Sequence, residues 1–260
     1  MGMGDDLLFL GKAEEIYKRT GKKIKPKYGT GWSILFDNVE FLSDDGVTVN
    51  ARDNDGPVDY HVDYYEDRKE NQRIIFKPFV PTPFRVRLSD QEISYAKDVI
   101  NNYKLDKFCI VNPDYKSTFF SHNKNWGFEK YQQLTNRLSE DIQVVRIMPG
   151  NNLYNEPHLE NAINITEKNI RNSISIMSFS HFGVSYDGLL QHVFSGFNIP
   201  AVIIQGGLVN REIMSYNMHL YHTYDHPDTP CGSMTECSHC KEANESITVD
   251  DVYASCLELL

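Results

Sequence analysis

The chain has 260 residues, of which 40% are hydrophobic and 24% charged, an ordinary balance for a globular protein with a sizeable core. The formal net charge of -10 counts against nucleic acid as a partner, although a local basic groove would still permit it. No run approaches the roughly 20 apolar residues that span a bilayer. The N-terminus lacks the basic and apolar regions of a signal peptide, so a cytoplasmic protein without a transmembrane segment is expected.

The composition changes near residue 90, and this change predicts two domains, residues 1–88 and residues 89–260. The first is irregular. A helix is expected from Asp5 to about Thr20, ending at Gly21, and short strands are expected over 22–27, 33–36 and 47–51. Three prolines within residues 78–83 exclude a helix interior and indicate a linker or an edge segment.

Residues 89–260 alternate between short apolar strands and amphipathic helices. Ser89 and Asp90 begin a helix to about Tyr103, with Glu92 at capping-box spacing from Ser89. Strands are expected over 108–112, 144–148, 182–185 and 201–205, and helices over 128–138, 170–177, 189–197 and 248–260. This alternation predicts an α/β fold with a parallel sheet covered on both faces. Ligands bind outside the carboxyl ends of such strands, and these ends fall within 112–126, 149–154, 185–192 and 205–210.

One strand, turn and helix start in this domain has the chemistry of a phosphate site. Asp187 and Gly188 occupy the turn, and His192 lies about one helical turn later. Backbone N–H groups at a helix N-terminus attract phosphate, Gly188 allows close backbone approach, and His192 can face the same anion. The next strand ends at Gly206 and Gly207. An ordinary strand–helix unit with a packed histidine fits these residues equally well.

Two further motifs carry charge near expected helix starts. Lys124 and Trp126 follow the first strand of the second domain, where the lysine can neutralise a diphosphate and the tryptophan can wall the site. Taken alone, Lys124 fits a solvated surface charge better. Gly4 and Asp5 open the N-terminal helix, where a carboxylate is stabilised in its charged form. An aspartate there is also a common helix cap, and Asp6 can take either role.

These motifs and their order along the chain resemble those of glycosyltransferase family 9, the heptosyltransferase-like enzymes of the GT-B fold. The family carries Gly-Asp at its first helix, Lys-x-Trp after the first strand of the nucleotide domain, and an acidic residue, glycine and histidine at a strand–helix turn. A proline, an apolar strand and a glycine follow, as Pro200 to Gly207 do here. The resemblance implies two Rossmann-like domains with parallel sheets. Residues 1–88 would form a reduced N-terminal, acceptor-side domain, and residues 89–260 the nucleotide-sugar-binding domain.

The resemblance also implies an activity. A hexosyl, heptosyl or pentosyl group would move from a nucleotide-sugar donor to a hydroxyl of a saccharide or glycan, by inverting displacement that needs no metal or other cofactor. Asp5 would accept the acceptor proton. The implied donor-binding residues are Lys124, Trp126, Asp187, Gly188, His192, Gly206 and Gly207.

Two departures from the family pattern keep alternatives open. Leu189 stands where the family usually has a glycine, and the strand that usually precedes Gly-Asp is not expected here. One alternative is a nucleotide-sugar-binding protein without turnover. Another is the same transfer chemistry on a modified base of phage DNA.

The C-terminal part contains Cys231, Cys237 and Cys240, with His239 between the last two. A Cys-x-x-Cys pair suits tetrahedral zinc, and three thiolates with one histidine can close a structural site. Free thiols packed under the last helix fit the spacing too. So does a disulfide from Cys231 to one of the others, although a cytosolic setting disfavours it. No catalytic metal is indicated.

Overall fold

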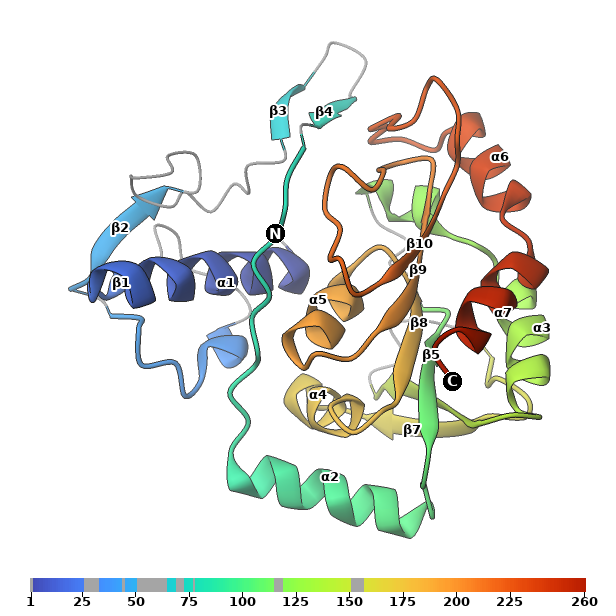
Figure 1. The fold of residues 1–260 in the computed structure, drawn as a ribbon, viewed down its shortest axis with the longest axis horizontal. Coiled ribbons are helices and arrows are strands. Elements are labelled where there is room, and N and C mark those ends of the chain that lie inside the picture. Colours follow the sequence, from blue (N-terminus) through green and yellow to red (C-terminus); the bar gives the residue numbers. More distant parts are fainter. Residues whose placement is uncertain are drawn as a thin grey trace.

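The computed structural model describes residues 2–25, 33–43, 45–50, 65–68, 73–76, 78–114, 119–150 and 157–260. Its centre is a six-stranded sheet in the order β10-β9-β8-β5-β6-β7 (Figure 1), and all its strand pairs are parallel. This is the order of a doubly wound Rossmann sheet. The strands are β5 (Phe108–Asn112), β6 (Gln143–Pro149), β7 (Ile163–Glu167), β8 (Phe182–Tyr186), β9 (Ala201–Gly206) and β10 (Leu220–Thr223).

Helices cover both faces of this sheet (Figure 1). One face carries α1 (Met3–Thr20), α2 (Asp90–Asn102), α4 (Ile170–Met177) and α5 (Leu189–Gly196), and the other carries α3 (Phe128–Leu138) and α7 (Val249–Leu257). In β5, Phe108 and Ile110 pack on the first face, and Cys109 and Val111 pack on the second, as the alternation of a strand requires. Burial on both faces explains the continuous apolar runs in these strands.

Helix α1 lies beside α5 and shares the core of the sheet (Figure 1). It ends where Gly21 adopts a left-handed conformation with φ 70°, as expected. The segment 78–88 approaches both helices closely: a Cβ at Gly11 would lie 2.0 Å from the Thr82 oxygen, and one at Gly196 would lie 2.1 Å from the Phe84 oxygen. Only glycine permits such approaches, so α1 is packed closely against the six-stranded sheet.

The described residues between α1 and residue 89 include two small sheets. Among the described residues before 89, β1 (Ile24–Lys25) pairs with β2 (Val47–Asn50), and β3 (Tyr65–Arg68) pairs with β4 (Ile74–Phe76). The prediction of a strand over 33–36 is wrong, because Ser33–Phe36 forms a 3-10 helix, η1, that buries Leu35. Residues 26 and 27, expected to end the first strand, lie outside the described part. None of the described helices is long and apolar enough to cross a bilayer.

The expected strands over 108–112, 144–148, 182–185 and 201–205 are confirmed within one residue at either end. The helices expected around 90–103, 128–138, 170–177, 189–197 and 248–260 are also confirmed, with the last ending at Leu257. The described elements that were not predicted are β3, β4, η2 (Phe119–Lys124), β7, β10 and α6 (Ser238–Ser246).

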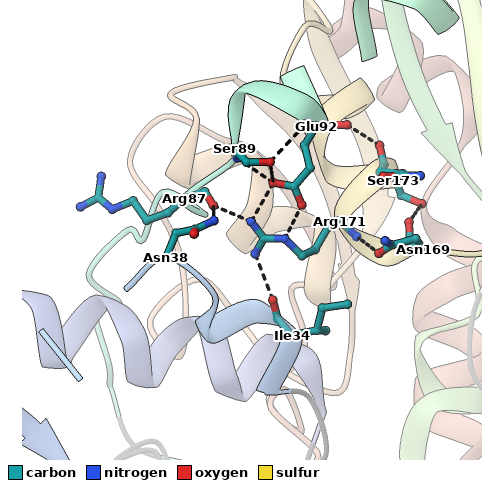
Figure 2. Close-up of polar contacts among 10 residues, drawn as sticks. Ile34, Asn38, Arg87, Ser89, Glu92, Asn169, Arg171 and Ser173 are labelled. Carbon is teal, nitrogen blue, oxygen red and sulfur yellow. Dashed lines mark hydrogen bonds and ion pairs between the residues drawn. The ribbon is translucent and has the colours of Figure 1, made fainter. Parts of the chain in front are cut away.

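A buried arginine joins four segments of the first face (Figure 2). Arg171, at the start of α4, is 3% exposed and donates to both carboxylate oxygens of Glu92 in α2. It also donates to the carbonyl oxygens of Ile34 in η1 and Arg87 in the preceding segment. Glu92 caps its own helix by accepting from the Ser89 N–H at 2.7 Å, so the capping box is confirmed.

This junction gives a prediction for acid stability. The hydrogen bond from Arg171 lowers the pKa of the Glu92 carboxyl group from 4.5 to about 2. A carboxylate with a lowered pKa in the folded state stabilises the fold above its unfolded pKa, and this contribution disappears as the pH falls from 4.5 toward 2. The Glu92→Gln variant should therefore have a lower melting temperature than the wild type at pH 7. Between pH 4.5 and pH 2, its melting temperature should fall by less than that of the wild type. The exposed Glu140 provides the control substitution Glu140→Gln, and equal slopes for Glu92→Gln and the wild type would contradict the prediction.

Candidate functional site

The strand order reverses between β5 and β8, because the chain continues from β5 to β6 on one side and from β8 to β9 on the other. Loops that leave the carboxyl ends of such strands diverge and form the usual ligand crevice of an open α/β sheet. Asn112 ends β5 and Tyr186 ends β8. The motifs that contain Lys124 and Asp187 follow these two strands. Part of the expected search region after β6, residues 151–154, lies outside the described residues.

An ion pair bridges the two loops at this reversal. Lys124 ends the 3-10 helix η2 (Phe119–Lys124), and its Nζ lies 2.5 Å from Asp187 Oδ2 and donates to the Asp187 carbonyl at 3.1 Å. The two side chains are only 13% and 5% exposed. Gln191 donates to the other carboxylate oxygen of Asp187. A largely desolvated ammonium group is therefore held in a defined position at the carboxyl edge of the sheet.

Helix α5 begins directly after this ion pair. Gly188 is its N-cap in an extended conformation, and no side chain caps the first turn. The N–H groups of that turn and the positive end of the helix dipole favour an anion. Gly188 also packs closely beneath the ring of Tyr186, since a Cβ there would lie 2.9 Å from its Cε2 atom. Lys124, Asp187 and Gly188 thus come together as the sequence indicates.

His192 lies one turn into α5 but is not a second cation. It is 3% exposed, and its Nδ1 lies 2.7 Å from the Tyr216 hydroxyl. Burial lowers the pKa of His192 to about 4, so the imidazole is neutral at pH 7. Its Nε2 faces α1, because a Cβ at Gly4 would lie 3.4 Å from that atom. His192 can therefore contribute a hydrogen bond to a ligand, and not a positive charge.

The same contact brings the N-terminus of α1 to the N-terminus of α5. A Cβ at Gly4 would lie 3.7 Å from the Leu189 Cα. The next residue, Asp5, is half-buried and accepts a hydrogen bond from the Gly2 N–H at 2.9 Å through Oδ2. Asp6 is 1% exposed. Asp5 is therefore the more accessible of the two carboxylates expected at this position.

Three other residues that were expected to bind the donor pack closely against neighbouring side chains. Trp126 is 3% exposed, donates from Nε1 to the Ile247 carbonyl at 2.9 Å, and contacts the Tyr131 ring edge-on. Its indole therefore packs in the core of the α3 and α7 face and does not wall a solvent-accessible site. At Gly206, with φ 62°, a Cβ would meet the Asn244 amide of α6. At Gly207 it would meet the His239 ring of the same helix.

A layer of hydrogen bonds behind the ion pair was not predicted. The Tyr221 hydroxyl donates to Gln191 Oε1 at 3.2 Å and accepts from the Tyr216 N–H at 2.8 Å. His219 Nε2 lies 3.0 Å from the Gln191 carbonyl. These contacts hold Gln191, and through it Asp187, in a single arrangement. The helical spacing of Asp187 and Gln191 was the only sequence signal for this layer.

No protein-family model and no curated protein matches the sequence. Among solved structures, a glycosyl transferase family 9 protein from Veillonella parvula DSM 2008 matches with a TM-score of 0.51 at 12% sequence identity, over 67% of this chain and 53% of that chain. Over about two thirds of its length, the chain shares the fold of this solved structure. The likeness lies in the α/β architecture with its parallel sheet, which confirms the expected fold class.

Two other solved structures match with lower TM-scores. The E. coli ADP-heptose lps heptosyltransferase II matches at 18% identity and a TM-score of 0.48, over 67% of this chain and 53% of that chain. The iron-containing dodecameric glycosyltransferase TibC from enterotoxigenic E. coli H10407 matches at 14% identity and a TM-score of 0.48, over 69% and 48%. The chain thus spans about half the length of these three solved structures.

Proposed function

We propose that the protein is a glycosyltransferase that moves a sugar from a nucleotide-sugar donor to a hydroxyl group of a saccharide or glycan. The observation that carries this proposal is the Lys124–Asp187 ion pair at the reversal of strand order, beside the uncapped first turn of α5. A cation and backbone N–H groups at one edge are the groups that recognise a diphosphate. The family 9 fold supports the same reading, since the Veillonella protein is a glycosyl transferase.

The donor diphosphate would lie against the start of α5. Lys124 would stabilise the negative charge that develops on the diphosphate as it leaves, an effect that is strongest in a partly desolvated site. Asp187 orients the Lys124 ammonium group, and Gly188 lets the diphosphate approach the backbone. His192 would donate a hydrogen bond as a neutral imidazole. Trp126, Gly206 and Gly207 would support the site through packing.

The acceptor would enter from the side of α1. Its hydroxyl oxygen would attack the anomeric carbon while the bond from that carbon to the diphosphate oxygen breaks, in one inverting displacement. Asp5 would take the hydroxyl proton. Lys124 and the α5 N-terminus would stabilise the leaving group, so the chemistry assigned to these residues needs no metal. Residues 1–88 would form the acceptor side, and residues 89–260 the donor side.

Lys124 provides the direct test of this function. Nucleotide-sugars are first screened for those that raise the melting temperature of the wild type, because a ligand that binds the native state stabilises it by mass action. Lys124→Met combined with Asp187→Asn removes the cation without leaving a buried carboxylate lacking its partner. Loss of a hydrogen bond to a charged group costs about 1.5–3 kcal/mol, so donor affinity in calorimetry should fall roughly 10- to 100-fold.

The matched control is Lys241→Met, which removes an exposed lysine from α6. It should bind the donor as the wild type does. If the Lys124→Met/Asp187→Asn variant folds and keeps wild-type donor affinity, the proposed donor site is wrong. If the wild type binds donor but transfers sugar to no acceptor, the protein is a binding protein and not a transferase.

A further inference from the structure

Four potential metal ligands meet beside the end of β9. Cys231, Cys237, His239 and Cys240 each offer one ligand atom, and these atoms all lie within 4.8 Å of one another. Cys231 and Cys240 are buried, at 4% and 0% exposure, and their sulfur atoms are 2.8 Å apart. In a tetrahedral zinc site with Zn–S bonds of about 2.3 Å, neighbouring sulfur atoms lie about 3.8 Å apart. A single ion can therefore reach all four ligands after small side-chain movements.

His239 gives an independent indication of a ligand. One ring nitrogen, Nε2, lies 3.3 Å from the Thr229 hydroxyl. The other, Nδ1, is buried and has no hydrogen-bond partner among the residues that the structure describes. A buried polar atom in this state calls for an explanation. A metal-bound histidine typically has this pattern, with one nitrogen on the ion and the other hydrogen-bonded to a neighbouring group.

The backbone around the cluster favours thiolates. Cys237 is the N-cap of α6, and Cys240 lies in its first turn. The positive end of a helix dipole stabilises a nearby thiolate, which is the form of cysteine that binds metals. Three thiolates and one imidazole in a closed, largely buried cluster are a ligand set that suits a structural zinc ion.

We propose that Cys231, Cys237, His239 and Cys240 bind a structural Zn²⁺ ion. The ion would tie the start of α6 to the loop that precedes it. That loop is joined to β4, because the Ile74 N–H donates to the Gly232 carbonyl at 2.7 Å. It is also joined to the turn that follows β9, because the Cys231 N–H donates to the Gly207 carbonyl at 3.0 Å.

The same ion would also brace the loop that carries Lys124. The preceding residue, Asn123, is 3% exposed and donates to the carbonyls of Ser233 and Thr235 at 3.0 and 2.8 Å. Its side-chain oxygen accepts from the Cys237 N–H at 3.1 Å. The metal-binding segment therefore holds the Asn123 side chain through three hydrogen bonds. This places the zinc ion outside the reaction, as a support for the fold.

Metal analysis of the purified 260-residue chain tests this proposal without any donor or acceptor. The expected result is about one zinc per chain, retained through gel filtration. Cys240→Ser and His239→Ala should lose the zinc. The matched control is Cys256→Ser, which changes a buried cysteine outside the cluster and should keep it. A second test does not depend on the folding of Cys240→Ser: a chelator should lower the melting temperature of the wild type, and added Zn²⁺ should restore it.

Several results would overturn the assignment. These are wild-type protein that lacks zinc after growth and purification with added zinc, a disulfide between Cys231 and Cys240 in protein purified under reducing conditions, and iron in place of zinc at the site. Zinc retained by the His239→Ala and Cys240→Ser variants would place any bound metal elsewhere. Each of these results leaves the proposed transferase activity untouched, since none depends on donor binding.

Discussion

Replacing Asp5 with asparagine is expected to reduce sugar transfer by about 10²- to 10⁴-fold, the usual range for loss of a general base, with donor affinity near that of the wild type. The amide cannot accept the acceptor proton. Its oxygen can still accept the hydrogen bond from the Gly2 N–H that Asp5 Oδ2 accepts at 2.9 Å, so the start of α1 should be preserved. The substitution therefore separates the proton acceptor from the helix cap.

Three measurements check this prediction, namely the single-turnover rate, the donor dissociation constant and the melting temperature. Asp6→Asn is the matched variant, because Asp6 is the neighbouring carboxylate and is 1% exposed. Asp6→Asn should lower the melting temperature and leave the single-turnover rate near that of the wild type. If Asp5→Asn keeps near-native turnover and Asp6→Asn loses it at unchanged donor affinity, Asp6 is the base and the assignment of Asp5 is wrong.

The second large effect concerns stability. Arg146 in β6 is 1% exposed and forms a two-bond ion pair with Asp114, with Nη2 at 2.5 Å from Oδ1 and Nε at 3.3 Å from Oδ2. Removing one member of a buried pair leaves an uncompensated charge and typically costs 3–5 kcal/mol. Arg146→Met should lower the free energy of unfolding by about this amount, measured by urea denaturation. Arg146→Met combined with Asp114→Leu should recover most of the loss.

An exposed pair of the same residue types provides the comparison. Arg137 and Asp250 also lie 2.5 Å apart, but their side chains are 41% and 87% exposed. Water screens such a pair, so Arg137→Met should cost about 1 kcal/mol or less. Equal losses for Arg146→Met and Arg137→Met would show that burial does not set the strength of the Arg146–Asp114 pair.

The central strands of the sheet were predictable because burial on both faces leaves apolar runs such as Phe108 to Val111. The edge strands were not. The sequence Ile-Asn-Ile-Thr-Glu of β7 mixes polar and apolar residues, and all four residues of β10 are only partly buried. Helix α6 has few apolar residues, and its buried residues are Cys240, Ala243 and Asn244. The four-residue run that forms η1 does not distinguish a strand from a helical turn.

The candidate site was predictable as far as topology decides it. Lys124 and Asp187 follow the carboxyl ends of neighbouring parallel strands, so the fold brings them together. Side-chain direction is not visible in a motif, which explains why Trp126 was expected beside Lys124 at the site but packs into the core. Gln191, Tyr216 and Tyr221 were missed because their hydrogen bonds join segments with no shared sequence pattern.

The close packing of α1 has a consequence for how the site is assembled. Gly11 and Gly196 let the segment around Thr82 and Phe84 lie against both α1 and α5, so these helices cannot slide apart without breaking the core. Asp5 and Lys124 are therefore carried by elements that pack against the same sheet. In enzymes where catalytic groups sit on separate lobes, a hinge must close before each turnover. If Asp5 and Lys124 act as we propose, this packing would preorganise the base and the donor cation before the substrates bind.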